Sequence, residues 1–205
     1  MPRFPEVPLR LWMRNAAGVA ALLLLCGCQV VKEDNSSDLP LDPTTRACVD
    51  PGSGLVFPKY LDGQTRVSVT QNAPSRGCLQ VYYEKKQTPT TTNQLNYYLH
   101  CRVFVIPKSM ITPDGWIKVA LREAQEKPNF TREEYQGQRI FGKESALVAQ
   151  AAFDRPVWND RALVKLAVVQ RGNYLICFDF GIAAVYEKEW QPSIDCFVEA
   201  ILESR

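Results

Sequence analysis

The strongest constraint on the fold lies late in the chain, where two runs of alternating apolar residues are separated by a short turn. Residues Ala162 to Gln170 and Asn173 to Phe180 alternate along their length, and Arg171-Gly172 stands between them. Successive side chains of a strand point to opposite faces of a sheet, so this period of two is typical of strands. The sequence therefore predicts an antiparallel hairpin with one buried face.

The segment after this hairpin predicts a helix. Beyond Pro192, apolar residues recur at intervals of three and four up to about Ser204, as they do on one side of an α-helix. These residues are Ile194, Phe197, Val198, Ile201 and Leu202. We interpret the stripe as packing against the sheet.

Shorter runs upstream extend the predicted sheet. They are Thr65 to Thr70, Cys78 to Glu84, Cys101 to Ile106 and Trp116 to Leu121. Residues Ala146 to Phe153 fit a helix or a strand, and their place before Asp154-Arg155-Pro156 slightly favours a strand.

One further helix is predicted in the middle of the chain. Thr131-Arg132-Glu133-Glu134 has the S/T-x-x-E form of a capping box, and Gly137 would end the helix. Together these elements predict an α+β domain, an antiparallel sheet flanked by helices with the C-terminal helix packed on the sheet.

The N-terminal segment has the layout of an export signal. Residues 1–14 carry three arginines, residues 15–25 form an uncharged apolar run, and Cys26-Gly27-Cys28 follows. The run is too short to span a bilayer as a stable helix. Residues 29–46 are polar and contain prolines without a sustained period, so we expect residues 28–46 to form a tether and residues 47–205 a single globular domain.

Leu25-Cys26-Gly27-Cys28 resembles the bacterial lipobox, in which a leucine and two small residues precede a cysteine. The resemblance implies a signal peptide of residues 1–27, cleavage after Gly27 and acylation of Cys28 by palmitate-type chains. Cys26 stands where the lipobox usually has Ala or Ser, and an unlipidated secretory signal is the alternative. Because Gln29 rather than Asp follows Cys28, the Gram-negative sorting rule implies the outer membrane, with the domain on its periplasmic face.

Two further resemblances concern the domain. Gly172-Asn173-Tyr174 at a strand entry, the aromatic pair Tyr186 and Trp190, and the Phe-x-x-x-Ile-Leu-x-Ser ending from Phe197 resemble Mog1/PsbP-like domains, which implies an α/β/α sandwich. A lipobox followed by a small domain that opens with Gly54-Leu55-Val56 also resembles periplasmic lipoproteins that give immunity against type VI secretion effectors. Neither resemblance supplies a binding residue.

Composition and motifs argue against several functions. Lys and Arg number 24 against 22 Asp and Glu, so nucleic acid is not an expected partner. His100 is the single histidine, and there is no nucleophile elbow, phosphate-binding glycine pattern or C-x-x-C among the cysteines after Cys28. We therefore expect no catalytic residue, no metal and no cofactor, and interpret the acid pairs Glu133-Glu134 and Glu187-Lys188-Glu189 as solvated.

The cysteines of the domain predict at least one disulfide, because an exported chain meets oxidising conditions. Cys78 with Cys101 is the favoured pair, since each opens one of two successive strand-like runs, but the spacing leaves the connectivity open. Cys196 is predicted on the outer side of the last helix near its N-terminus, as a bridge with Cys48 or, less favoured, as an activated thiol. The candidates are Cys48, Cys78, Cys101, Cys177 and Cys196.

These observations predict a non-catalytic protein-binding module, either an immunity protein against a secreted effector or an envelope accessory protein. The alternative is a small periplasmic enzyme or thiol-redox protein, which would need His100, Cys196 or the acid pairs to converge in one pocket. Tyrosine and tryptophan are enriched in interfaces, although strand alternation turns about half of such residues inward. The candidate partner contacts are Tyr82, Tyr83, Tyr97, Tyr98 and Trp158.

Overall fold

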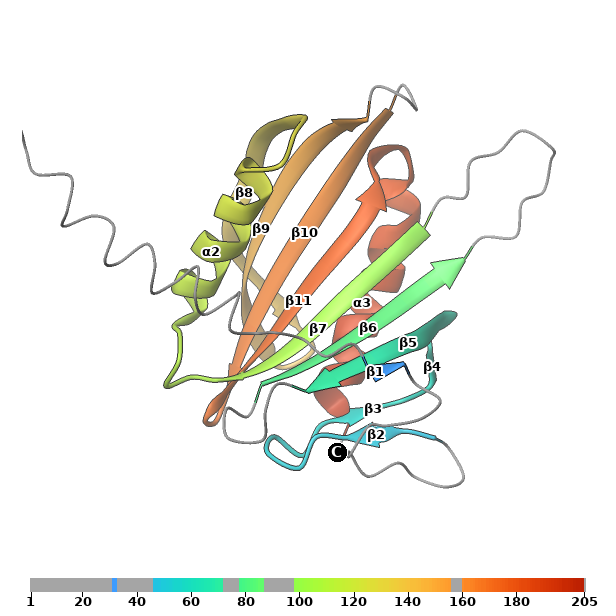
Figure 1. Cartoon of the computed structure of the whole chain (residues 1–205), viewed down its shortest axis with the longest axis vertical. Helices are drawn as coiled ribbons and strands as arrows, with labels where there is room; N and C mark the ends of the chain where they lie inside the picture. Colours follow the sequence, from blue (N-terminus) through green and yellow to red (C-terminus); the bar gives the residue numbers. More distant parts are fainter. Residues whose placement is uncertain (1–30, 33–45, 72–77, 87–97, 156–159, 205) are drawn as a thin grey trace, which may run out of the picture.

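The computed structural model describes residues 31–32, 46–71, 78–86, 98–155 and 160–204, and they form the α+β domain that the sequence predicts (Figure 1). At its centre is a nine-stranded sheet with antiparallel pairings, in the order β1-β5-β6-β7-β11-β10-β9-β8, with β4 also paired to β5. The strands are β1 (Val31–Lys32), β4 (Tyr60–Leu61), β5 (Gln64–Gln71), β6 (Leu79–Lys86), β7 (Tyr98–Pro107), β8 (Phe130–Phe141), β9 (Glu144–Arg155), β10 (Asp160–Arg171) and β11 (Tyr174–Ala183). A separate ribbon pairs β2 (Cys48–Val49) with β3 (Val56–Phe57).

Two helices lie on opposite faces of the sheet, α2 (Pro113–Gln125) in front and α3 (Glu187–Glu203) behind in Figure 1. A 3-10 turn, η2 (Ala184–Tyr186), leads into α3. Each helix has its own apolar core: Phe197 of α3 packs edge-on against Tyr83 and Phe180, and Trp116 of α2 lies 6.0 Å from the ring of Phe104. The layering is therefore helix, sheet, helix.

The predicted hairpin is confirmed as β10 and β11. Arg171 pairs with Tyr174, so the turn consists of Gly172 and Asn173, one residue later than expected. Gly172 has a φ of 56°, a left-handed conformation that costs glycine little. The prediction of one buried face is wrong, because the residues of β11 from Leu175 to Ala183 are buried on both faces of the strand.

The strand predicted at Trp116 to Leu121 is instead part of α2. The Thr112 hydroxyl accepts a hydrogen bond from the Gly115 amide at 3.1 Å, and Pro113 begins the helix, where its missing amide proton costs nothing. The buried side of the helix, Trp116, Ile117, Leu121 and Ala124, follows a period near 3.6. The alternation seen over six residues was too short to distinguish the two structures.

The helix predicted at Thr131 to Gly137 is wrong, because these residues belong to strand β8. Pairing with β9 extends from Phe130 to Phe141 and outweighs the local capping pattern. The register shifts between Phe130 and Arg132 and again between Glu133 and Tyr135, so the stretch with the helix signal is the irregular part of the strand.

The other predicted elements are confirmed, with longer bounds. The strands expected at 65–70, 78–84, 101–106 and 146–153 are β5, β6, β7 and β9. The C-terminal helix begins at Glu187 and includes Pro192, and its predicted apolar stripe is buried. Within the predicted tether, Val31–Lys32 pair with β5 as β1, and residues 33–45 lie outside the described residues. Neither helix in the described part of the chain has the length and apolarity needed to cross a membrane.

The contrast between the two capping signals can be tested by two matched substitutions. Thr112→Ala removes a hydroxyl that caps α2, so we expect the free energy of unfolding to fall by about 1 kcal/mol. Thr131→Ala changes an exposed strand residue that caps no helix, and its effect should stay within about 0.5 kcal/mol. Urea unfolding followed by circular dichroism measures both, and an equal loss in the two variants would contradict the assignment.

Candidate functional site

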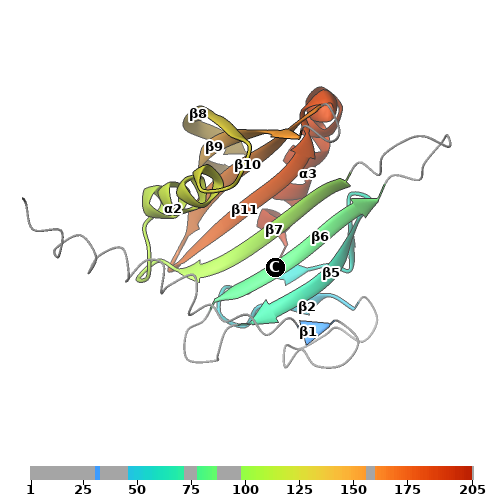
Figure 2. The same cartoon turned by 45° about the horizontal axis from the view of Figure 1, so that its top comes forward.

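Half of one sheet face is left open by the helices. α2 covers β8, β9 and β10 and one end of β11 and β7, at Leu175, Cys177 and Phe104. Beyond these residues, no helix of the described chain lies over β11, β7 and β6 on this face (Figures 1 and 2). Odd-numbered residues of β6 and β7 and even-numbered residues of β11 point into the core under α3, so their neighbours point to the open face. We call five of these the open-face cluster: Tyr82, Glu84, His100, Arg102 and Asp179.

An ion pair lies at the centre of the open-face cluster. Asp179 and Arg102 are direct neighbours on β11 and β7, and Arg102 donates to the Asp179 carboxylate. Asp179 is only 6% exposed, and the Arg102 guanidinium is the cation that compensates its buried carboxylate. The Arg102 guanidinium also lies 5.9 Å from the centre of the Phe104 ring, which fixes it along the strand.

His100 occupies a space that glycine provides. It is the direct neighbour of Gly181 on β11, and a β-carbon at position 181 would overlap its ring. The Tyr82 ring lies 6.1 Å from it at 44°. Burial lowers the pKa of His100, although Asp179 opposes the shift, and the imidazole is neutral at pH 7. Burial and then Glu84 raise the pKa of Tyr82, which keeps its phenol protonated.

The open-face cluster is suited to recognition. It presents a neutral imidazole, a phenol and an ion pair, groups that exchange hydrogen bonds with a polar partner. The nearest thiol, Cys101, points to the opposite core, and burial raises its pKa well above the ordinary range. Among the described residues, no three His, Cys, Asp or Glu side chains gather as they would around a metal ion.

The groups named for the enzyme alternative do not converge within the described residues. His100 is on the open face, whereas Cys196 is exposed on α3 behind the sheet. Glu187 also belongs to α3, where its carboxylate lies 2.6 Å from the Lys165 Nζ. The side chains of Glu133 and Glu134 lie outside the described residues.

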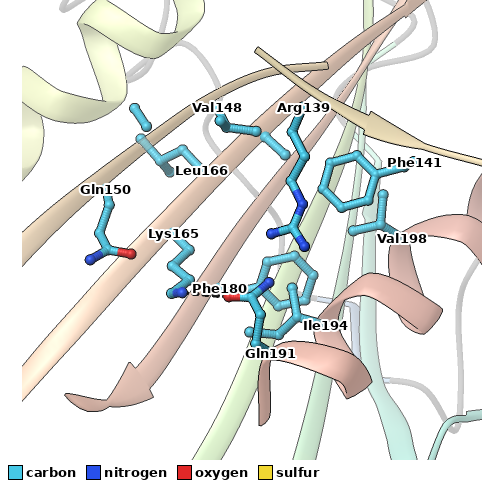
Figure 3. A pocket seen from close by; sticks show the side chains of 12 residues that line it. Arg139, Phe141, Val148, Gln150, Lys165, Leu166, Phe180, Gln191, Ile194 and Val198 are labelled. Carbon is cyan, nitrogen blue, oxygen red and sulfur yellow. Dashed lines mark hydrogen bonds between the residues drawn. The ribbon is translucent and has the colours of Figure 1, made fainter. Parts of the chain in front are cut away.

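A small pocket lies behind the sheet, between α3 and strands β8 to β10 (Figure 3). Its volume is about 110 Å³, and Phe141, Phe180, Ile194 and Val198 form its apolar wall. A chain of polar contacts crosses its rim. Arg139 donates to Asp195 at 2.5 Å, Gln191 donates to Asp195 at 2.8 Å, and Lys165 donates to Gln191 at 2.5 Å. Both rim cations therefore have acidic partners on α3, so the pocket offers an apolar hollow of side-chain size rather than an anion site.

The five cysteines in the described part of the chain form no disulfide with one another. Cys78 precedes Leu79, which is opposite Val105, whereas Cys101 is opposite Tyr83. The two are therefore about five residues, or about 16 Å, apart along the strands, which is beyond the reach of a disulfide. The predicted Cys78 to Cys101 bond is wrong for this reason.

The other cysteine positions also differ from expectation. Cys48 and Cys177 are buried, and burial raises the pKa of Cys177 well above the ordinary range. Cys196 is exposed on the outer side of α3, as predicted, but α3 begins at Glu187, so Cys196 is in the middle of the helix. The argument for an activated thiol at a helix N-terminus therefore does not apply.

The predicted aromatic contacts separate into three groups. Tyr82 is half-buried and lies on the open face. Tyr83 is fully buried against Phe197, so the prediction that it contacts a partner is wrong. Because side chains alternate along a strand, one of Tyr82 and Tyr83 had to point into the core. Tyr97, Trp158 and the side chain of Tyr98 lie outside the described residues.

Sequence reasoning missed Arg102, Asp179 and Gly181. A signal for them was present in the strand 174–183, YLICFDFGIA, where Asp179 is the single charge in an otherwise apolar run. A buried carboxylate needs a cation on a neighbouring strand, but finding that cation requires the register. The pairing of β7 with β11 joins distant parts of the chain, and no local pattern reports it.

Comparison with known proteins gives no family. No family model matches the chain, and no curated protein matches it. Among solved structures, the chain is similar to PA94 of Pseudomonas aeruginosa, a protein of unknown function, with 8% identity and a TM-score of 0.42 over 62% of this chain and 85% of that one. It is also similar to LpqN of Mycobacterium tuberculosis, which is involved in cell envelope biogenesis, with 11% identity and a TM-score of 0.40 over 95% of each chain. The likeness to Mog1/PsbP-like domains stays a prediction.

The buried His100 makes stability depend on pH in a definite direction. The unfolded chain takes up a proton near the ordinary pKa of 6.5, and the folded protein only at lower pH. The free energy of unfolding should therefore fall as the pH drops through about 6.5. Unfolding curves at about pH 7.5 and about pH 5.5 measure the fall, and His100→Gln should reduce it. NMR of this single histidine gives its pKa directly, and a value at or above 6.5 would contradict the burial argument.

Proposed function

We propose that this chain is an outer-membrane lipoprotein, anchored through Cys28, whose periplasmic domain is a non-catalytic protein-binding module. The anchor rests on the charged start, the apolar run of residues 15–25 and the lipobox resemblance at Leu25-Cys26-Gly27-Cys28. Gln29 supports outer-membrane sorting. Acyl chains on Cys28 would hold the domain at the membrane surface without a spanning helix.

The observation that carries the binding proposal is the open-face cluster. The part of the sheet beyond α2 carries Tyr82, Glu84, His100 and Arg102, all half-buried, and no second helix of the described chain lies over them (Figure 2). Tyrosine and arginine are frequent in interface hot spots. Tyr82 has few rotatable bonds and Arg102 is already held by Asp179 and Phe104, so both lose little side-chain freedom when a partner binds. The partner is a protein, a secreted effector that the module neutralises or an envelope component that it assists.

The anchor predicts one specific modification. In the native organism, Cys28→Ala should abolish incorporation of labelled palmitate and release the protein from the outer-membrane fraction, because the acylated sulfur is lost. Cys26→Ala is the matched control, two residues away, and should keep both the label and the location. A label that survives Cys28→Ala would exclude Cys28 as the anchor.

The open-face cluster predicts where the partner binds. Chemical cross-linking in native cells and capture of the full chain should yield one stoichiometric partner. Tyr82→Ala should then weaken its binding by about 2 kcal/mol, roughly thirtyfold in Kd. Val185→Ala is the control, because Val185 is 70% exposed in the turn that leads into α3 and is not part of the cluster. If no partner is captured and His100→Gln abolishes a hydrolytic activity of the folded protein, the binding proposal fails and the enzyme alternative stands.

A further inference from the structure

The edge of the sheet at β8 is open to another strand. β8 pairs with β9 on its inner side, and no strand of the described chain pairs with its outer side, whereas β5 near the opposite edge is paired by β1 and β4 as well as by β6 (Figures 1 and 2). Backbone amides and carbonyls on such an edge form a template for an added strand. The two ends of the sheet therefore differ in what they can bind.

Only one half of β8 has the regular geometry that strand addition needs. The first half contains the register shifts near Arg132 and Glu133, and such bulges protect an edge. From Gly137 to Phe141 the register with β9 is continuous, and the stretch has no proline or lysine. Its single charge, Arg139, is turned toward α3 and held by Asp195 at 2.5 Å. The Gly137 to Phe141 half of β8 therefore lacks the bulges, proline and lysine that usually prevent another strand from pairing with a sheet edge.

The side chains beside this edge differ between its two faces. On the α2 side, Ile140 is 73% exposed, the highest exposure among the large apolar residues of the described chain. On the α3 side, the residues at every fourth position of α3 are Glu187, Gln191, Asp195, Glu199 and Glu203, a row along one side of the helix.

The end of this acidic row next to β8 has no cationic partner among the residues that the structure describes. Lys165 pairs with Glu187 and Arg139 with Asp195. Glu199 accepts a hydrogen bond from the Gly142 amide at 3.0 Å, just beyond the end of β8. The Glu203 carboxylate lies close to the same glycine, and no cation of the described residues pairs with Glu199 or Glu203. Two carboxylates therefore flank the edge and are available to a positively charged partner.

We propose that the Gly137 to Phe141 edge of β8 binds an extended segment of a partner protein in which apolar residues alternate with lysine or arginine. Alternate side chains of an added strand point to opposite faces of the sheet. One set would lie on Ile140, and the other would meet Glu199 and Glu203. This inference rests on the proposed binding function but uses a surface distinct from the open-face cluster.

The test uses a defined peptide in place of the unknown partner. The mature lipidated protein, purified in detergent, is titrated into fluorescein-labelled Gly-Lys-Val-Lys-Val-Lys-Val-Gly, and anisotropy gives the Kd. The control peptide, Gly-Lys-Lys-Lys-Val-Val-Val-Gly, has the same charge and composition without alternation. We expect the alternating peptide to bind at least tenfold more tightly, and equal binding would overturn the proposal.

Variants assign the binding to this edge. Ile140→Lys places a charge on an exposed strand position, and Glu199→Gln with Glu203→Gln removes both charges while keeping the acceptor for Gly142. Each should raise the Kd at least tenfold with an unchanged melting temperature, and the glutamine variant should also lose the salt dependence. Val185→Lys, another highly exposed aliphatic position, should leave the Kd unchanged. Unaltered binding in both edge variants would refute the site.

Two sets of outcomes distinguish partner binding at this edge from self-association and from binding at the open-face cluster. If sedimentation shows a dimer that Ile140→Lys dissociates, the edge binds a second copy of this chain, and the assignment to a partner protein is wrong. Tyr82→Ala should not alter peptide binding. A captured partner lost with Tyr82→Ala but no peptide binding would therefore overturn this inference alone. Peptide binding with no captured partner and a hydrolytic activity that His100→Gln abolishes would overturn the proposed function alone.

Discussion

Burial of strand β11 on both faces is the constraint on which the rest of the structure depends. From Leu175 to Ala183 the strand exposes almost nothing, so one set of its side chains must be covered in front and the other behind. α3 supplies the rear cover through Phe197, which meets Phe180 of β11 and Tyr83 of β6. α2 supplies only part of the front cover, over Leu175 and Cys177. Where that cover ends, β11 carries Asp179 and Gly181, and the sheet becomes polar.

The sequence predicted the architecture correctly where a pattern was long enough to distinguish a period of two residues from one of 3.6. The β10 and β11 runs and the stripe from Ile194 to Leu202 each contain several repeats, and both predictions hold in element type, although β11 is buried on both faces. The two errors, at Trp116 to Leu121 and at Thr131 to Gly137, concern six or seven residues. Over six or seven residues, a helix cap, the strand register or a neighbouring strand determines whether the segment forms a helix or a strand. Of these three, only the cap can be recognised from the local sequence.

The candidate site was less accessible than the fold, because it depends on which strands are neighbours. Tyr82 was identified by residue type alone, and the same reasoning also selected its buried neighbour Tyr83. Arg102, Asp179 and His100 become a cluster only through the pairing of β7 with β11 and β6. The sequence shows each residue, but a long-range register brings them together.

The same register has a consequence for how the chain reaches its native state. Strands β8 to β11 pair in chain order, and β5 to β7 do likewise, so each group has short-range contacts that form quickly. The join between β7 and β11, where Val103 meets Phe178, closes a long loop that contains α2, β8, β9 and β10. Closing that loop costs entropy before its contacts are gained, so it is the slow step of assembly. A nascent chain therefore cannot complete its sheet until the residues of β11 have emerged, and α3 covers the sheet afterwards.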